Sequence, residues 1–153
     1  MQLDLKTLLP QLLPRAIAWA EATAADAAAS GIPLDDTGLS IANAVGVHHP
    51  SLIRVQMVDR LPLPSDLELH AAALQTGLLA PTMTGLTLGH SILICNGHLS
   101  RWLLSHECRH VYQFEQAGSI AAFLPAYLRS IVEAGYSNSP FEQDARAHEL
   151  IDV

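Results

Sequence analysis

The sequence predicts an α+β fold, in which a helix-rich domain carries a small, mostly antiparallel sheet packed near one central helix. Alanine and leucine are abundant and aromatic residues make up only 5% of the chain, a composition that favours helices. Apolar and polar residues alternate, as in half-buried strands, around residues 53–58, and a second strand-like stretch covers 86–95. With 153 residues, of which half are hydrophobic, the chain is long enough for one domain with a real core.

The elements of this fold follow from apolar periodicity and from residues that begin and end helices. We expect helices over residues 4–30, 37–45, 66–79, 101–117, 120–134 and 141–151, and strands over 53–58 and 86–95. Asp35 or Asp36 can cap the second helix and Ser65 the third, whereas Pro14 could divide the first. Gly89 could bend the second strand into a hairpin.

The composition also bears on location and partners. The net charge is −7 and Lys6 is the single lysine, so no basic stripe for nucleic acid or an anionic membrane is present. No apolar run reaches the ~18–20 residues of a transmembrane helix, and the first residues lack the pattern of a signal peptide. Cys95 and Cys108 are the only cysteines, and we expect both to be buried free thiols, with a metal-ligand role for a cysteine as the minor alternative. A cytoplasmic protein is therefore expected.

The most informative stretch is the predicted helix over 101–117, which contains the motif His-Glu-x-x-His. His106 and His110 are four residues apart and therefore project from one face of a helix, where two imidazoles can bind one Zn²⁺. Glu107 lies beside them as a possible general base for a metal-activated water molecule. Eight histidines and seven glutamates in 153 residues would produce this motif by chance about 0.02 times, so it is informative.

A hydrolytic zinc site usually has three protein ligands, so a third residue is needed. The downstream candidates are Glu133, Glu142, His148 and Glu149. Glu142 is preferred because it falls in the first turn of the predicted last helix. The small Ala145, three residues on, would let that helix lie close to the histidines. Carboxylates are also common in a first turn simply because they complement the helix dipole, and His148 and then Glu149 remain alternatives.

This part of the chain resembles small bacterial zincin-like proteins, which are similar to minimal gluzincins. The resemblance rests on the stretches His106–Glu115 and Pro140–Arg146, with Gly118, Tyr127 and Tyr136 between them, and is weaker over the N-terminal helices. It implies a single zincin-like domain over 1–153, with N-terminal helices and first strand in 1–64 and a metal-site core in 65–153. It also implies His106, His110 and Glu142 as zinc ligands and Glu107 as the base. The downstream motif lacks the aspartate found four residues after the glutamate in larger gluzincins.

The function expected from these residues is that of a zinc-dependent metallopeptidase acting on a peptide or protein substrate. Tyr136, just before the last predicted helix, is the candidate that would stabilise the oxyanion, with His98 and Tyr112 as alternatives, although a structural role is commoner for each. His90 is a further residue that could face the cleft. A strand over 87–94 could offer its edge to an extended peptide.

Two other functions fit the same residues. One is a non-catalytic zinc-binding domain in which the metal stabilises a small fold or supports a partner interface. The other is a regulatory or toxin-like module that uses the fold without a metal. Glu107 favours the enzyme, because a structural zinc site needs no acid between its two histidines.

Overall fold

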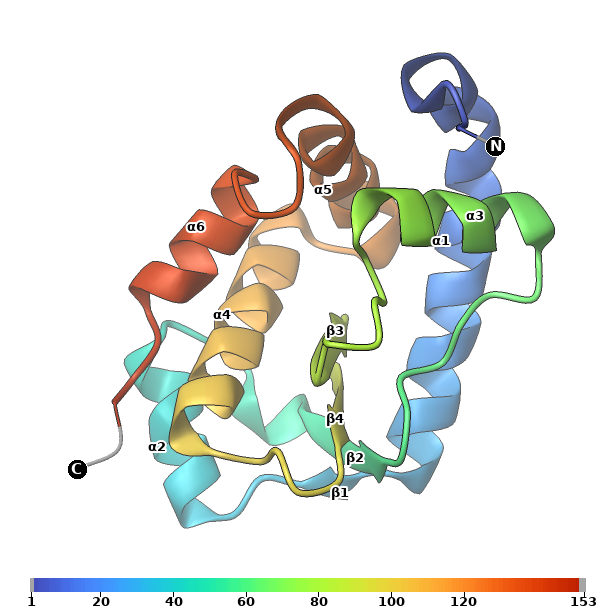
Figure 1. Cartoon of the computed structure of the whole chain (residues 1–153). Coiled ribbons are helices and arrows are strands. Elements are labelled where there is room, and N and C mark those ends of the chain that lie inside the picture. The colour runs from blue at the N-terminus through green and yellow to red at the C-terminus, as the bar shows by residue number, and fades with distance from the viewer. Residues whose placement is uncertain (1, 152–153) are drawn as a thin grey trace.

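The computed structural model describes residues 2–151 and has the expected α+β architecture (Figure 1). Within these residues six α-helices surround a four-stranded mixed sheet. The elements are α1 (Leu5–Ser30), β1 (Ile32–Pro33), α2 (Asp36–Ala44), a 3-10 turn (Pro50–Leu52), β2 (Arg54–Val58), α3 (Leu67–Thr76), β3 (Gly85–Leu88), β4 (Ser91–Cys95), α4 (Arg101–Ala117), α5 (Ile120–Ala134) and α6 (Pro140–Ala147). None of the helices in this range is long and apolar enough to cross a lipid bilayer.

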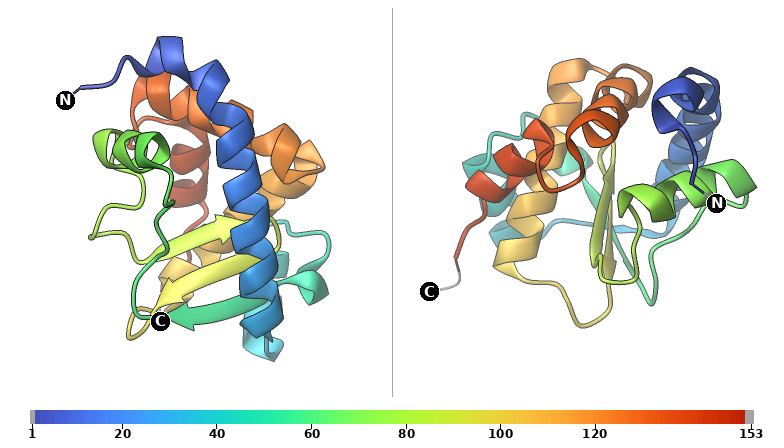
Figure 2. Two further views of the ribbon diagram at one scale, coloured as in Figure 1. Left: turned by 90° about the vertical axis from the view of Figure 1, so that its right-hand side faces the viewer. Right: turned by 45° about the horizontal axis from the view of Figure 1, so that its top comes forward.

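The sheet has the strand order β1-β2-β4-β3. The pairs β1–β2 and β3–β4 are antiparallel, whereas β2 and β4 run parallel, so the sheet is mostly antiparallel as expected. α1 lies across one face of the sheet and α4 lies on the other (Figures 1 and 2). β3 forms the edge of the sheet opposite β1. It contacts α4, so this edge lies beside the His-Glu-x-x-His helix.

The hairpin suggested by Gly89 is confirmed. Gly89 adopts a positive φ of 66° between β3 and β4, a conformation that glycine reaches without strain. The strand β1 was not expected, because it has only two residues, one of which is a proline. Proline is tolerated there since β1 lies at the edge of the sheet.

The first helix is continuous, although Pro14 could have divided it. Pro10 and Pro14 both lie inside α1, and Figure 2 shows the helix changing direction within its first turns. Leu12, Leu13 and Ala20 are buried, so packing holds the segment helical even though each proline removes one backbone hydrogen bond.

Three helix boundaries differ from the expectation. α3 ends at Thr76, three residues before the expected end at 79, because Gly77 follows it in the left-handed conformation. α3 begins after Asp66, not Ser65, because the Asp66 carboxylate accepts hydrogen bonds from the backbone N–H groups of Glu68 and Leu69. α6 ends at Ala147, four residues before the expected end at 151. There the backbone N–H of Leu150 donates to Ser105 Oγ on α4, at 2.8 Å, so the chain leaves the helix to pack on its neighbour.

The main core lies between α2, the sheet and α4. Its buried members include Ile41, Val45, Ile53, Ile92, Ile94, Leu104, Cys108 and Val111. α4 therefore has one face fixed in the core, which holds the helix that carries the two histidines against the sheet. Cys95 and Cys108 are both free thiols as expected, but only Cys108 is buried, whereas Cys95 at the end of β4 is partly exposed.

Candidate metal centre

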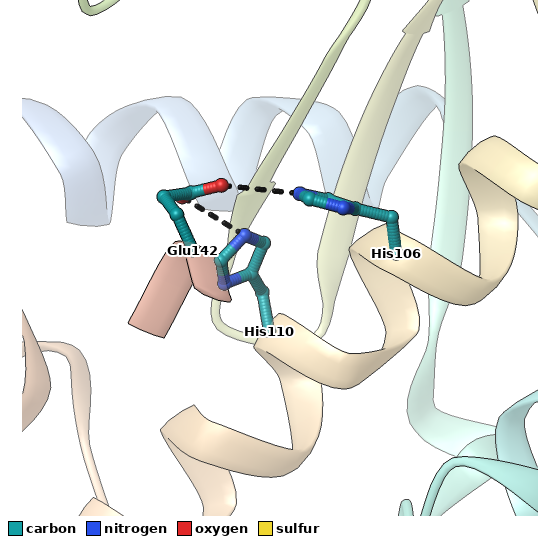
Figure 3. A group of neighbouring side chains, drawn as sticks. All are labelled: His106, His110 and Glu142. Carbon is teal, nitrogen blue, oxygen red and sulfur yellow. Dashed lines mark hydrogen bonds and ion pairs between the residues drawn. The ribbon is translucent and has the colours of Figure 1, made fainter. Parts of the chain in front are cut away.

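Three side chains from two helices converge at one point (Figure 3). His106 Nε2 lies 3.1 Å from Glu142 Oε1, and His110 Nε2 lies 3.1 Å from Glu142 Oε2. The possible ligand atoms of the three residues all lie within 4.8 Å of one another. The structure thus brings together both histidines of the motif and the preferred third residue, 32 positions after His110 in the sequence.

The local structure of α6 explains how Glu142 reaches this point. Ser139 caps the helix by accepting a hydrogen bond from the backbone N–H of Phe141, and Pro140 occupies the first helical position. Ala145 is fully buried, so no bulky side chain keeps α6 away from its neighbours. Glu142 is itself only 1% exposed, and a buried carboxylate requires partners of opposite charge or a metal.

Hydrogen bonds fix the orientation of both imidazole rings. His106 Nδ1 lies 2.8 Å from Glu149 Oε2, and His110 Nδ1 lies 2.8 Å from Gln113 Oε1. An ionised carboxylate only accepts, so His106 Nδ1 carries the proton. The Gln113 amide nitrogen is already a donor to Phe141 O, so the Gln113 oxygen accepts from His110. With Nδ1 protonated in both rings, each Nε2 atom faces Glu142, and a metal that displaces the Nε2 proton would find a lone pair there.

The sequence did not indicate these two orienting residues. Gln113 is three residues after His110 on the same helix, a spacing that could have suggested the contact. From the sequence, Glu149 is a candidate metal ligand and not an orienting residue. It contacts the site because α6 ends early, and its second oxygen accepts a hydrogen bond from the Trp102 indole at 2.7 Å.

The charges of the three residues are strongly coupled. Burial opposes ionisation of Glu142, but hydrogen bonds from His106 and His110 outweigh it and hold the pKa of this carboxyl far below its usual range. Burial likewise opposes protonation of His106, yet the hydrogen bond to Glu142 and the nearby Glu107 charge raise its pKa to about 9. Without a metal, the cluster therefore consists of a carboxylate held by protonated imidazole. A bound dication would replace that positive charge.

Tyr127 is a further partner of Glu142 that the sequence did not single out for this role. Its hydroxyl donates to Glu142 Oε2 at 2.7 Å. Burial and the adjacent Glu142 charge raise the pKa of Tyr127, so the hydroxyl keeps its proton and remains a donor.

Glu107 projects from α4 toward β3. Glu107 is buried, at 5% exposure. The Thr87 hydroxyl oxygen lies 2.8 Å from Glu107 Oε1 and 3.0 Å from the Glu107 carbonyl oxygen. Gly85 leaves the space that the carboxylate occupies, because a Cβ at Gly85 would lie 2.8 Å from Glu107 Oε2. The edge strand β3 thus sets the position of the candidate base.

Replacing Gly85 with alanine is expected to move the Glu107 carboxylate, since no Cβ fits within 3.0 Å of it. If the site has the zinc-dependent hydrolytic activity expected from the sequence, hydrolysis should fall at least about tenfold while the zinc content stays at the wild-type level, because a small misplacement of a catalytic group is costly. Metal analysis and peptide hydrolysis measured on the same preparation check this result. An active Gly85→Ala protein would contradict the role given to the glycine.

Tyr136 lies in the same region as the candidate base. It lines one cavity together with Glu107, His110 and Glu142. Burial, and then the negative charges of Glu142 and Glu107, raise the pKa of Tyr136, so its hydroxyl stays protonated. A protonated phenol in this cavity can donate a hydrogen bond to an oxyanion.

The other candidate residues lie elsewhere. His98 and Glu133 are exposed, and Tyr112 stacks on His48 beneath the Arg109 guanidinium. His90 is 2.9 Å from Glu115, and His148 is bound to Asp144. None of them belongs to the cluster of His106, His110 and Glu142.

Comparisons with protein families, with curated proteins and with solved structures find no match for this chain.

Proposed function

We propose that the protein is a gluzincin-type zinc metallopeptidase that hydrolyses peptide bonds. The observation that carries the proposal is the convergence of two imidazole Nε2 atoms and one carboxylate, with a second buried acid, Glu107, adjacent in the sequence to the first histidine. Three protein ligands leave one position for water or substrate, which is the arrangement of catalytic zinc sites.

The donor set fits zinc. Two imidazole nitrogens and a carboxylate oxygen are common zinc ligands, and both imidazoles have their other nitrogen held by a hydrogen-bond acceptor, Glu149 or Gln113. A dication bound between Glu142 and its two imidazole neighbours would balance the negative charge of the buried Glu142 carboxylate. No cysteine enters the cluster, since Cys108 lies in the hydrophobic core.

The remaining groups have roles in peptide hydrolysis. Zinc, when bound, supplies a Lewis acid that polarises the scissile carbonyl and makes water more acidic. Glu107 accepts the proton of the attacking water and delivers it to the leaving amine, while Thr87 holds the Glu107 carboxylate in place. Tyr136 donates to the oxyanion. Within residues 2–151 the outer strand β3 pairs with β4 alone, which leaves its other edge for an extended peptide.

Metal removal tests the proposal. Purified protein is expected to contain about one zinc per chain, and to cleave members of a mixed fluorogenic peptide library. Dialysis against a chelator should remove the metal and the activity together, and stoichiometric zinc should restore both. Metal-free protein that cleaves peptides as fast as the zinc-loaded protein would exclude the proposed zinc-dependent mechanism.

One observation favours the non-catalytic alternative, a zinc site that stabilises the fold or a partner interface. The cluster is enclosed, because Glu142 is 1% and His110 8% exposed, and structural zinc sites are typically closed. Full zinc occupancy with no cleavage of any peptide in the library would support this alternative.

A further inference from the structure

A cavity of about 170 Å³ lies directly against the candidate metal centre. Glu107, His110, Tyr136 and Glu142 stand among its lining residues. Most of the remaining wall is apolar and comes from four elements on one side of α4 (Figure 1). Representative wall residues are Leu12 and Trp19 of α1, Ala72 of α3, Leu86 of β3, and Leu124 and Leu128 of α5.

The size and lining of the cavity limit what it can hold. An apolar cavity of about 150 Å³ accommodates one benzene molecule, so the space here suits one large aliphatic or aromatic group. Leaving such a space empty costs stability, because the lining side chains lose contacts that a packed core would give them. The α1, α3 and α5 walls are mostly apolar, so burying a charged or strongly hydrated group against them would cost free energy.

The position of the cavity relates it to the scissile bond. β3 contributes both Thr87, which holds Glu107, and Leu86, which lines the cavity. In a peptide extended along β3, successive side chains point to opposite sides, so a residue next to the reacting carbonyl would direct its side chain into this space.

We propose that this cavity is the specificity pocket of the enzyme and receives a large apolar side chain, such as leucine or phenylalanine, from the residue that adjoins the scissile bond. The inference rests on the proposed function and adds the substrate class to it. Part of its wall comes from α1, where the resemblance to zincin-like proteins is weakest.

Filling the cavity tests the proposal. Ala72 is half-buried on α3 and lines the cavity, whereas its neighbour Ala71 does not. Ala72→Phe should occupy the space, and Ala71→Phe is the matched control on the same helix. The substrates are two peptides that differ only in carrying leucine or glycine beside the cleaved bond.

Wild-type and Ala71→Phe proteins are expected to prefer the leucine peptide by about 10- to 100-fold in kcat/KM, the range set by burial of one apolar side chain. Ala72→Phe should lose most of that preference and still cleave the glycine peptide. Equal rates of wild type on both peptides would overturn the pocket assignment.

A second measurement does not depend on catalysis. Benzene should raise the thermal unfolding midpoint of zinc-loaded wild-type and Ala71→Phe proteins but not that of Ala72→Phe. If benzene binds in this pattern while no peptide is cleaved, the apolar binding site stands and the peptidase proposal fails. If benzene has no effect on wild type, the pocket proposal is wrong even where peptides are cleaved.

Discussion

Replacing His110 with alanine is expected to leave the purified protein without stoichiometric zinc. The substitution removes one of three converging ligand atoms, and it leaves Glu142 Oε2 and the Gln113 carbonyl oxygen without their imidazole partner. Loss of a residue that merely orients a ligand weakens metal binding by about 10- to 100-fold, so loss of a ligand should exceed that range. Elemental analysis after gel filtration measures the zinc content.

The same variant should lose the stabilisation that zinc gives the folded state. A ligand present at 100 times its Kd stabilises a protein by about 2.7 kcal/mol, so wild-type protein should melt several degrees higher with zinc than after chelation. His110→Ala should show no such difference. His98→Ala is the control because His98 is exposed and lies outside the cluster.

His110 is buried, so its replacement could disturb the fold and release zinc for that reason alone. A second variant, at a less buried ligand, tests the metal site independently. His106 is 12% exposed and contributes the other Nε2 atom, so His106→Ala should lose zinc as well. Circular dichroism of both variants should retain the helical signal. A folded His106→Ala or His110→Ala protein with full zinc occupancy would show that the metal binds elsewhere.

Sequence patterns predicted most of the fold because the relevant signals are local. The helix over 101–117 and the helix over 120–134 have the expected boundaries, since Ser100 and Ser119 cap their beginnings and Gly118 and Gly135 follow their ends. The hairpin at Gly89 was visible for the same reason. The fate of Pro14 and the end of α6 depended on packing against distant elements, which local patterns do not report.

The residues of the candidate site also fall into two groups, those that local sequence predicts and those that only tertiary structure brings to the site. The spacing of His106 and His110 is a property of one helix, so the sequence alone placed them together. Glu142 followed from the cap and the small residue of its own helix. By contrast, Thr87, Tyr127 and Glu149 contact the site through tertiary structure. Glu149 shows this most clearly, because a helix continued to residue 151 would not have released it to fold back onto His106.

The second large effect concerns Glu107, which distinguishes catalysis from metal binding. Glu107→Gln keeps the size and shape of the side chain, and Thr87 can still donate to its remaining oxygen. The amide cannot accept a proton from water at neutral pH, so the step assigned to Glu107 is lost. General acid–base catalysis contributes about 10²- to 10⁴-fold to the rate, so kcat should fall by at least about 100-fold.

Zinc content must be measured on the same variant, because it separates a loss of catalysis from a loss of the metal. Glu107 is not among the converging ligand atoms, so Glu107→Gln should bind zinc as wild type does and show the same zinc-dependent rise in melting temperature. Glu133→Gln, at an exposed position, should leave both properties unchanged. Hydrolysis at the wild-type rate by a zinc-loaded Glu107→Gln protein would show that Glu107 is not the general base, although an acid between the two histidines is the feature that a structural zinc site does not need.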